Sequence, residues 1–344
     1  MKRLLILAFC AALVLALGTV SLKAQRQGPI VSEPPQPPTP PAPRVIPRVL
    51  FLSNQGSTHF RLYSMKLDGT DVQQIPNWTD DDNWPSYSPD GRTIVFASFR
   101  TGSWHIFAMN SDGSGVSQLT NSPNMEMEPA YSPAGGVVAF TCKGPNWQDI
   151  CLSSANGGNM SSANGDNIVK LTDGLAFYSS PVFSPDGGTI AFVGVPKPHA
   201  PCSAGTAPGL APQPPPGPKP DIYILRLSYP LRPVKITDGS TARYAPVFTP
   251  DGRHIIYDQD AYGEDGTDPG LFVMGLDGSN QRPLTYYSGT PNDQPGTVGT
   301  KVVFTTPTFN GGVDIFSMSP DGSQVQRLTT NGATNLRYLN MFDY

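Results

Sequence analysis

The sequence predicts an all-β protein, a six-bladed β-propeller made of four-stranded blades. Two short motifs recur along the chain, and their spacing is typical of that fold. The first motif is the turn Ser-Pro-Asp-Gly or a close variant, which starts at Ser88, Ser132, Ser184 and Thr249. The second is Leu or Ile followed by Thr, which starts at Leu119, Leu171, Ile236, Leu284 and Leu328, with Ile75 and Pro76 as a degenerate first copy. Successive copies of the second motif lie 44, 52, 65, 48 and 44 residues apart.

The composition agrees with an all-β fold. Short apolar runs are separated by Gly, Pro, Asn and Asp, and the 344 residues include 35 Gly and 38 Pro. Charged residues make up 15% of the chain and the formal net charge is −4. A nucleic-acid-binding protein needs a basic stripe to displace counterions, so we expect no nucleic-acid partner.

Each repeat unit is predicted to hold four strands. In the second unit these are 84–88, 93–98, 104–110 and 116–120. The Ser-Pro-Asp-Gly turn suits the tight connection from the first strand to the second, because Pro presets φ and Gly takes the left-handed conformation. Asp-Gly pairs at Asp112, Asp277 and Asp321 do the same between the third and fourth strands. The repeated aspartates are therefore interpreted as structural and not catalytic.

The two ends of the repeat array predict how the ring closes. The first apolar run, Val49–Ser53, matches the second strand of a unit and not the first. First strands start ten residues after each Leu-Thr motif, and ten residues beyond Leu328 lies Tyr338. We therefore expect the C-terminal segment 335–344 to complete the blade that begins at Val49, in a propeller spanning 48–344.

The N-terminal residues predict export. Met1, Lys2 and Arg3 precede an apolar run from Leu4 to Leu22, so residues 1–24 are predicted to be a signal peptide. The alternative is an uncleaved anchor helix, which would be the one contact with a membrane. Residues 25–47 are rich in proline and are expected to form an extended linker. The expected location is periplasmic or secreted.

The repeat resembles that of the TolB-type, WD-repeat-like propellers. The resemblance lies in the patterns Pro-x-x-Ser-Pro-Asp-Gly, Ile-x-Phe-x-Ser, Ile-x-x-Met-x-x-Asp-Gly and Gln-x-Leu-Thr, which cover residues 48 to 344. TolB itself carries an α/β domain before its propeller, and here the proline-rich linker stands in that place. The resemblance implies the propeller fold and a role in binding, and we assign no role in the Tol–Pal system.

Motifs of catalysis are missing from the sequence. It contains no Gly-x-Ser-x-Gly, no Walker A loop, no His-Glu-x-x-His and no Cys-x-x-Cys. The four histidines, at 59, 105, 199 and 254, share no spacing typical of a metal site. The sequence therefore predicts a non-enzymatic binding module for an envelope protein or a glycan. The alternatives are a polysaccharide lyase or hydrolase, and a purely structural envelope protein.

Strand direction predicts where a ligand binds. The loops that precede the first strands, and the insertion 195–220, share one face, opposite the Ser-Pro-Asp-Gly turns. Residues just before each first strand then surround the channel mouth. They are Asp82, Trp84, Glu126, Glu128, Tyr178, Ser180, Arg243, Tyr244, Asn292, Gln294, Asn335 and Arg337. Aromatic, Arg and carboxylate side chains at a concave mouth suit a binding site.

Carboxylates near two first strands suggest a weak metal site. Asp80, Asp82, Glu126 and Glu128 could hold Ca²⁺, which prefers several oxygen ligands. The alternative is a solvated acidic loop balanced by Arg243 and Arg337, and no other cofactor is expected.

Two cysteines in one unit suggest a disulfide. Cys142 ends a second strand and Cys151 lies in the third strand of the same hairpin, so the two are expected to lie nearly opposite each other. In an oxidising compartment they would form a disulfide, and the alternative is a pair of buried thiols. Cys202 has no evident partner in the sequence.

Overall fold

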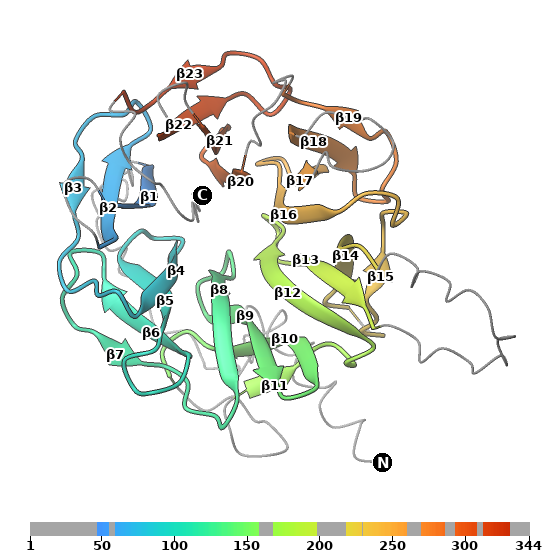
Figure 1. Cartoon of the computed structure of the whole chain (residues 1–344), viewed down its shortest axis with the longest axis horizontal. Coiled ribbons are helices and arrows are strands. Elements are labelled where there is room, and N and C mark those ends of the chain that lie inside the picture. Colours follow the sequence, from blue (N-terminus) through green and yellow to red (C-terminus); the bar gives the residue numbers. More distant parts are fainter. Residues whose placement is uncertain are drawn as a thin grey trace, which may run out of the picture.

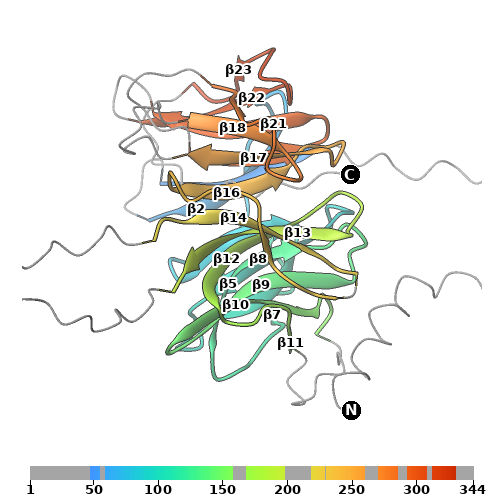
Figure 2. The same ribbon diagram turned by 90° about the vertical axis from the view of Figure 1, so that its right-hand side faces the viewer.

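The computed structural model describes residues 47–54, 59–157, 168–197, 218–228, 230–259, 270–285, 293–307 and 312–330. These residues form β-sheets arranged in a ring around a central axis (Figure 1), and Figure 2 shows the ring from its side. Several predictions fall outside these ranges. They concern the signal peptide, the linker, the closing segment 335–344, Asn292, Arg337 and Cys202.

Two sheets come from the N-terminal part of the ring. The first has three strands, β1 (Arg48–Ser53), β2 (Arg61–Lys66) and β3 (Gln73–Gln74). The second has four strands, β4 (Asp82–Tyr87), β5 (Thr93–Ser98), β6 (His105–Asn110) and β7 (Ser117–Gln118). The second strand of this unit has the predicted bounds, and the outer strand is shorter than the predicted 116–120.

The middle of the chain forms one eight-stranded sheet. Its first half holds β8 (Met125–Tyr131), β9 (Val137–Gly144), β10 (Trp147–Ser154) and β11 (Ile168–Lys170). Its second half holds β12 (Ala176–Phe183), β13 (Thr189–Pro196), β14 (Asp221–Arg226) and β15 (Val234–Lys235). Each half is antiparallel, and a parallel pairing of β10 with β12 at Gln148 and Phe177 joins them.

Two four-stranded sheets complete the described ring. One holds β16 (Arg243–Phe248), β17 (His254–Gln259), β18 (Gly270–Gly275) and β19 (Arg282–Pro283). The other holds β20 (Asp293–Val298), β21 (Lys301–Pro307), β22 (Val313–Met318) and β23 (Gln326–Arg327). The fold is an all-β propeller. The predicted count of six four-stranded blades is not confirmed, because hydrogen bonding groups the described strands into sheets of three, eight, four, four and four strands.

The Ser-Pro-Asp-Gly motif forms the turn between first and second strands, as predicted. In the turn at Ser184, the Ser184 hydroxyl donates to Asp186 Oδ1 at 2.5 Å, and the Gly187 N–H donates to the Ser184 carbonyl at 2.8 Å. This donation from Ser184 lowers the pKa of the Asp186 carboxyl. The aspartate of the motif thus stabilises a turn.

The threonine of the Leu-Thr motif fastens the outer strands, which are two or three residues long. Each threonine hydroxyl accepts a hydrogen bond from a backbone N–H at the start of the third strand, at 2.8–3.0 Å. The pairs are Ile106 with Thr120, Ile150 with Thr172, Ile222 with Thr237, Leu271 with Thr285 and Ile315 with Thr329. Four of these hydroxyls also donate to buried carboxylates, those of Glu126, Asp149, Asp221 and Asp314, at 2.5–2.7 Å.

Apolar side chains fill the space between neighbouring sheets. Val49 and Met65 of the first sheet belong to the same buried cluster as Val303 and Ile315 of the last sheet. Burying a side chain of this size contributes about 1.5–3 kcal/mol. The first and last described sheets therefore pack against each other.

A glycine marks a second contact between these two sheets. Gly69, in the turn after β2, has a φ of +81°, and a Cβ at this position would lie 2.3 Å from the Leu328 carbonyl oxygen. A backbone oxygen cannot move aside as a flexible side chain does. The Asp-Gly turn therefore needs glycine both for its conformation and for the close approach to the Leu-Thr motif of the last sheet.

We predict that Gly69→Ala lowers the free energy of unfolding by about 2–4 kcal/mol, measured by urea denaturation. The matched control is Gly102→Ala, because Gly102 also has a left-handed φ, +88°, but a Cβ there meets nothing within 4 Å. The control should cost about 1 kcal/mol. Equal losses in the two variants would contradict the contact between the first and last sheets.

Candidate functional site

A β-bulge interrupts the first strand at the same point in four successive repeat units. The ladder register shifts in β4, β8, β12 and β16, and the residue at the shift has a φ of 46–56°. These residues are Trp84, Glu128, Ser180 and Ala245, and each precedes a proline. A left-handed non-glycine residue before proline is strained, and bulges of this kind redirect a side chain. Figure 1 shows these strands next to the middle of the ring.

Aromatic side chains gather at the bulge of β4. The Trp84 and Trp104 rings meet edge to face with centroids 5.4 Å apart, and the Phe99 ring lies 5.7 Å from Trp104. Phe99 is 40% exposed. Met125, the first residue of β8, is 42% exposed. We call Trp84, Phe99 and Trp104 the aromatic corner. Trp84 and Trp104 are partly buried and Phe99 is exposed, and partly exposed aromatic side chains of this kind are common in binding hot spots.

Asp82, one of the predicted mouth residues, is buried in an ion pair. Its two carboxylate oxygens accept hydrogen bonds from Arg100 Nη2 at 2.6 and 2.8 Å, and Thr79 donates to it from its backbone and its hydroxyl. The carboxylate therefore orders the loop before β4.

Glu126 is also buried. Its Oε2 atom lies 2.7 Å from His105 Nδ1 and accepts a hydrogen bond from the Thr120 hydroxyl at 2.6 Å, while Ser122 donates to Oε1. These contacts link the end of one sheet to the first strand of the next.

Tyr178 and Arg243 are buried as well. Tyr178 packs edge to face on Phe192, and burial raises the pKa of its hydroxyl well above the ordinary value. Arg243 Nη1 donates to Asp238 Oδ1 at 2.9 Å. Backbone and side-chain hydrogen bonds from Ser240, together with Arg243, hold the pKa of Asp238 well below its usual range.

Glu128 bridges two neighbouring bulges. Its Oε2 atom accepts hydrogen bonds from the Thr141 hydroxyl at 2.6 Å and from the Ser180 N–H at 2.7 Å. Ser180 therefore contributes its backbone N–H here. The Gln294 side chain falls outside the described residues.

The four candidate calcium ligands point to separate partners. Asp80 pairs with His59 and Arg61, while Asp82, Glu126 and Glu128 make the contacts given above. Among the described residues, no group of three or more His, Cys, Asp or Glu side chains is arranged to hold a metal ion.

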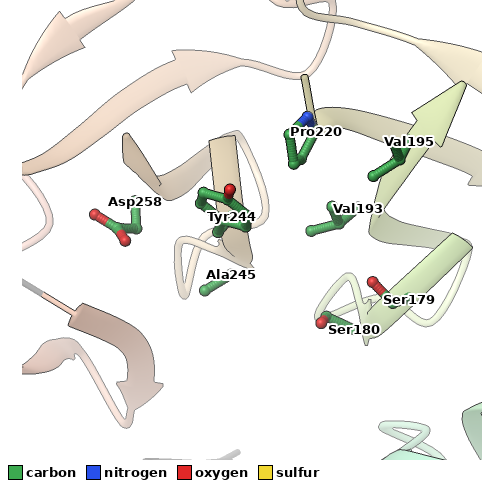
Figure 3. A pocket seen from close by; sticks show the side chains of 8 residues that line it. All are labelled: Ser179, Ser180, Val193, Val195, Pro220, Tyr244, Ala245 and Asp258. Carbon is green, nitrogen blue, oxygen red and sulfur yellow. The ribbon is translucent and has the colours of Figure 1, made fainter. Parts of the chain in front are cut away.

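A pocket of about 340 Å³ opens between β12–β13 and β16–β17 (Figure 3). Its walls combine apolar side chains with hydroxyls and one carboxylate. The lining residues are Ser179, Ser180, Val193, Val195, Pro220, Tyr244, Ala245 and Asp258. Tyr244, a predicted mouth residue, is 39% exposed. Asp258 was not singled out in the sequence analysis, because that considered residues just before each first strand and Asp258 lies on a second strand, β17.

Cys142 and Cys151 form a disulfide in the β9–β10 hairpin, with their Cα atoms 5.9 Å apart. The two cysteines are diagonal and not directly opposite: Cys142 pairs with Asp149 in the ladder, and Cys151 pairs with Phe140. Cys142 also pairs with Glu126 of β8. The disulfide therefore reinforces the second-to-third connection on the side of the predicted mouth.

The buried aspartates at the start of the third strands escaped the sequence analysis. Asp149, Asp221 and Asp314 each precede an isoleucine, and each sits beside a Lys or Arg of the outer strand. The repeated Asp-Ile pair was visible in the sequence, and its distance from the Leu-Thr motif could have identified it.

Comparison with known proteins agrees with a TolB-type propeller. Residues 39–163 match the profile of a family described as TolB beta propeller domain. No curated protein matches the sequence significantly. Within the described ranges, no helix is long and apolar enough to cross a membrane.

Solved structures share the fold at low sequence identity. TolB from Acinetobacter baumannii superimposes with a TM-score of 0.66 at 17% identity, over 87% of this chain and 67% of that one. Hydrazine synthase from Kuenenia stuttgartiensis gives 0.64 at 16%, over 86% of this chain and 46% of that one. A chain of a nidogen/laminin complex gives 0.60 at 9%, over 86% and 97%. These likenesses establish the propeller fold, which is a general binding scaffold.

We predict that Cys142 and Cys151 are both blocked when thiols are counted in the denatured, non-reduced protein. Reduction should expose two more thiols and lower stability by about 2–3 kcal/mol, because the disulfide closes a short loop. A Cys142→Ser variant should lose the same stability without reductant. If both cysteines react before reduction, the pair is a reduced one.

Proposed function

We propose that this protein is a non-enzymatic, exported binding module that recognises an envelope protein or a glycan at the channel mouth. The observation that carries the proposal is the set of four equivalent bulges in β4, β8, β12 and β16. The same strained backbone presents a different side chain at each of them. Trp84, Glu128, Ser180 and Ala245 occupy equivalent positions. Strained backbone of this kind persists only where the surrounding structure holds it in place, and it clusters at functional sites.

The aromatic corner supplies binding surface at this ring. Trp84 comes from the bulge of β4, while Phe99 and Trp104 come from the connection between β5 and β6. The Trp104 ring contacts both of the other rings, so little side-chain entropy is lost when a partner covers them. The pocket beside Tyr244 adds a concave site on the same ring of first strands.

Two features support export. The N-terminal sequence has the form of a signal peptide, with Lys2 and Arg3 before an apolar run. The disulfide between Cys142 and Cys151 fits an oxidising compartment such as the periplasm. Calcium at Asp80, Asp82, Glu126 and Glu128 would require these carboxylates to leave their present partners, so the proposal does not include it.

We predict that Trp84→Ala weakens binding at least about tenfold, because a tryptophan in an interface often carries 2 kcal/mol or more. The protein is used to capture its partner from an envelope extract, and the captured species is then titrated against each variant. Stability should fall by about 1 kcal/mol, from the lost contact with Trp104.

The control for this test is Asp186→Ala, on the opposite face. It removes the hydrogen bond from Ser184 in the turn, so it should lower the melting temperature and leave affinity unchanged. If Asp186→Ala abolishes binding while Trp84→Ala binds normally, the mouth is the wrong face.

We further propose that the ring holds six blades and that residues 335–344 complete the first of them. The packing of Val49 and Met65 against Val303 and Ile315 supports this, since it brings the two ends of the repeat array together. In the described part of the chain, β1 pairs with β2. Its other edge would be available to a closing strand.

Deletion of residues 335–344 should therefore lower stability sharply, by about 3 kcal/mol or more, because a strand edge becomes exposed and the ring opens. The measurement is urea denaturation of the truncated and full chains. A truncated protein that unfolds at the parent midpoint would show that the closing strand does not exist.

A further inference from the structure

The space between adjacent bulges is filled by a side chain at one junction of the ring. Between β8 and β12, Glu128 reaches across to the next bulge. Its Oε2 atom accepts hydrogen bonds from the Thr141 hydroxyl at 2.6 Å and from the Ser180 N–H at 2.7 Å. A carboxylate oxygen of the protein itself therefore marks an acceptor position beside a bulge N–H.

One junction further, the same positions carry shorter and apolar side chains. The ladder registers align Met127 and Thr141 with Ser179 and Val193. Ser180 thus stands where Glu128 stands, and Val193 stands where Thr141 stands. Ser180 is too short to cross the junction, and Val193 carries no hydrogen-bonding group.

Because Ser180 and Val193 do not fill this junction as Glu128 and Thr141 fill the preceding one, the 340 Å³ pocket lies here. The bulge residue on its far side is Ala245, which occupies the position of Ser180 in the next unit. Within the described residues, no side chain accepts a hydrogen bond from the Ala245 N–H. A ligand oxygen in the pocket can take the place that the Glu128 carboxylate takes one junction earlier.

We propose that this pocket binds one neutral sugar ring; the inference rests on the proposed function at the mouth. A ring hydroxyl or ether oxygen accepts from the Ala245 N–H, and a second hydroxyl donates to the Asp258 carboxylate. The half-exposed ring of Tyr244, which pairs with Asp258 across the ladder, and the Val195 side chain cover the apolar C–H face of the sugar.

The charge and the size of the pocket select the class of ligand. Asp258 is the one carboxylate among the lining residues, and none of them is Lys, Arg or His. A sugar acid or a phosphate would therefore bring a second negative charge close to this carboxylate, with no cationic side chain in the lining to attract it. An amine would suit Asp258 but would place a second donor against the Ala245 N–H. The volume lies near the lower end of ligand pockets, about 300 Å³, so it suits one ring.

The test uses the purified full chain and saturation-transfer NMR with the neutral methyl pyranosides of glucose, galactose and mannose. We expect at least one of them to bind with a Kd on the order of 1 mM, as a ligand of this size allows. Methyl glucuronoside and hexylamine are the charged probes, and both should bind at least about tenfold more weakly.

Two variants locate the site. Ser180→Glu supplies the side chain that fills the preceding junction, so it should fold normally and weaken sugar binding at least about tenfold. Asp258→Asn, which keeps the shape of the side chain, should weaken binding by a similar factor. The matched control is Ser117→Glu, an exposed position on the outer strand β7, which should leave binding unchanged.

Several results would overturn the proposal. They are the absence of binding by all three neutral pyranosides, equal binding by Ser180→Glu and Ser117→Glu, and tighter binding of a charged probe. If Ser180→Glu fails to fold, Asp258→Asn decides the outcome alone. The Trp84→Ala titration uses the captured partner, so the mouth can be confirmed as a binding face even when the sugar pocket is disproved.

Discussion

The propeller depends on one repeated hydrogen bond, which a threonine hydroxyl accepts at the end of five of the six described outer strands. Strands of two or three residues offer few ladder hydrogen bonds. The hydroxyl of Thr172 or Thr237 extends the pairing past the end of the strand by accepting the N–H of Ile150 or Ile222. Without it, a buried N–H would be left unpaired at a cost of about 1–3 kcal/mol. The residue before each threonine can then enter the core between two sheets.

The same hydroxyl needs an acceptor for its own proton, and the ring provides it in two ways. Asp149, Asp221 and Asp314 supply a carboxylate from the start of the third strand. At Thr120 the third strand begins with His105, and Glu126 of the next inner strand supplies the carboxylate instead. Glu126 is therefore buried because it accepts the threonine proton of the preceding unit. In the units of Asp149, Asp221 and Asp314, the threonine and the carboxylate belong to the same unit.

The sequence was sufficient to predict the repeat, the turns and the faces, because these follow from local chemistry. Pro, Asp and Gly set the turn, and strand direction sets which loops share a face. The burial of individual side chains could not be predicted in this way. Asp82 and Arg243 lie at the predicted face but are buried in ion pairs with Arg100 and Asp238, and the repeat pattern does not specify these pairings. The bulge was also hidden, since a register shift leaves no simple mark on the alternation of apolar residues.

The bulge explains how a repeated fold can carry a site that does not repeat. The proline after each bulge residue removes a backbone N–H and limits the conformations of its neighbour, so the backbone at the bulge is set by the repeat. The side chain at the bulge is not set in the same way. Tryptophan at 84 builds an aromatic surface, glutamate at 128 closes a junction, and serine at 180 leaves the next junction open. Substitution at one strained position therefore changes the surface of the mouth without changing the ring that supports it.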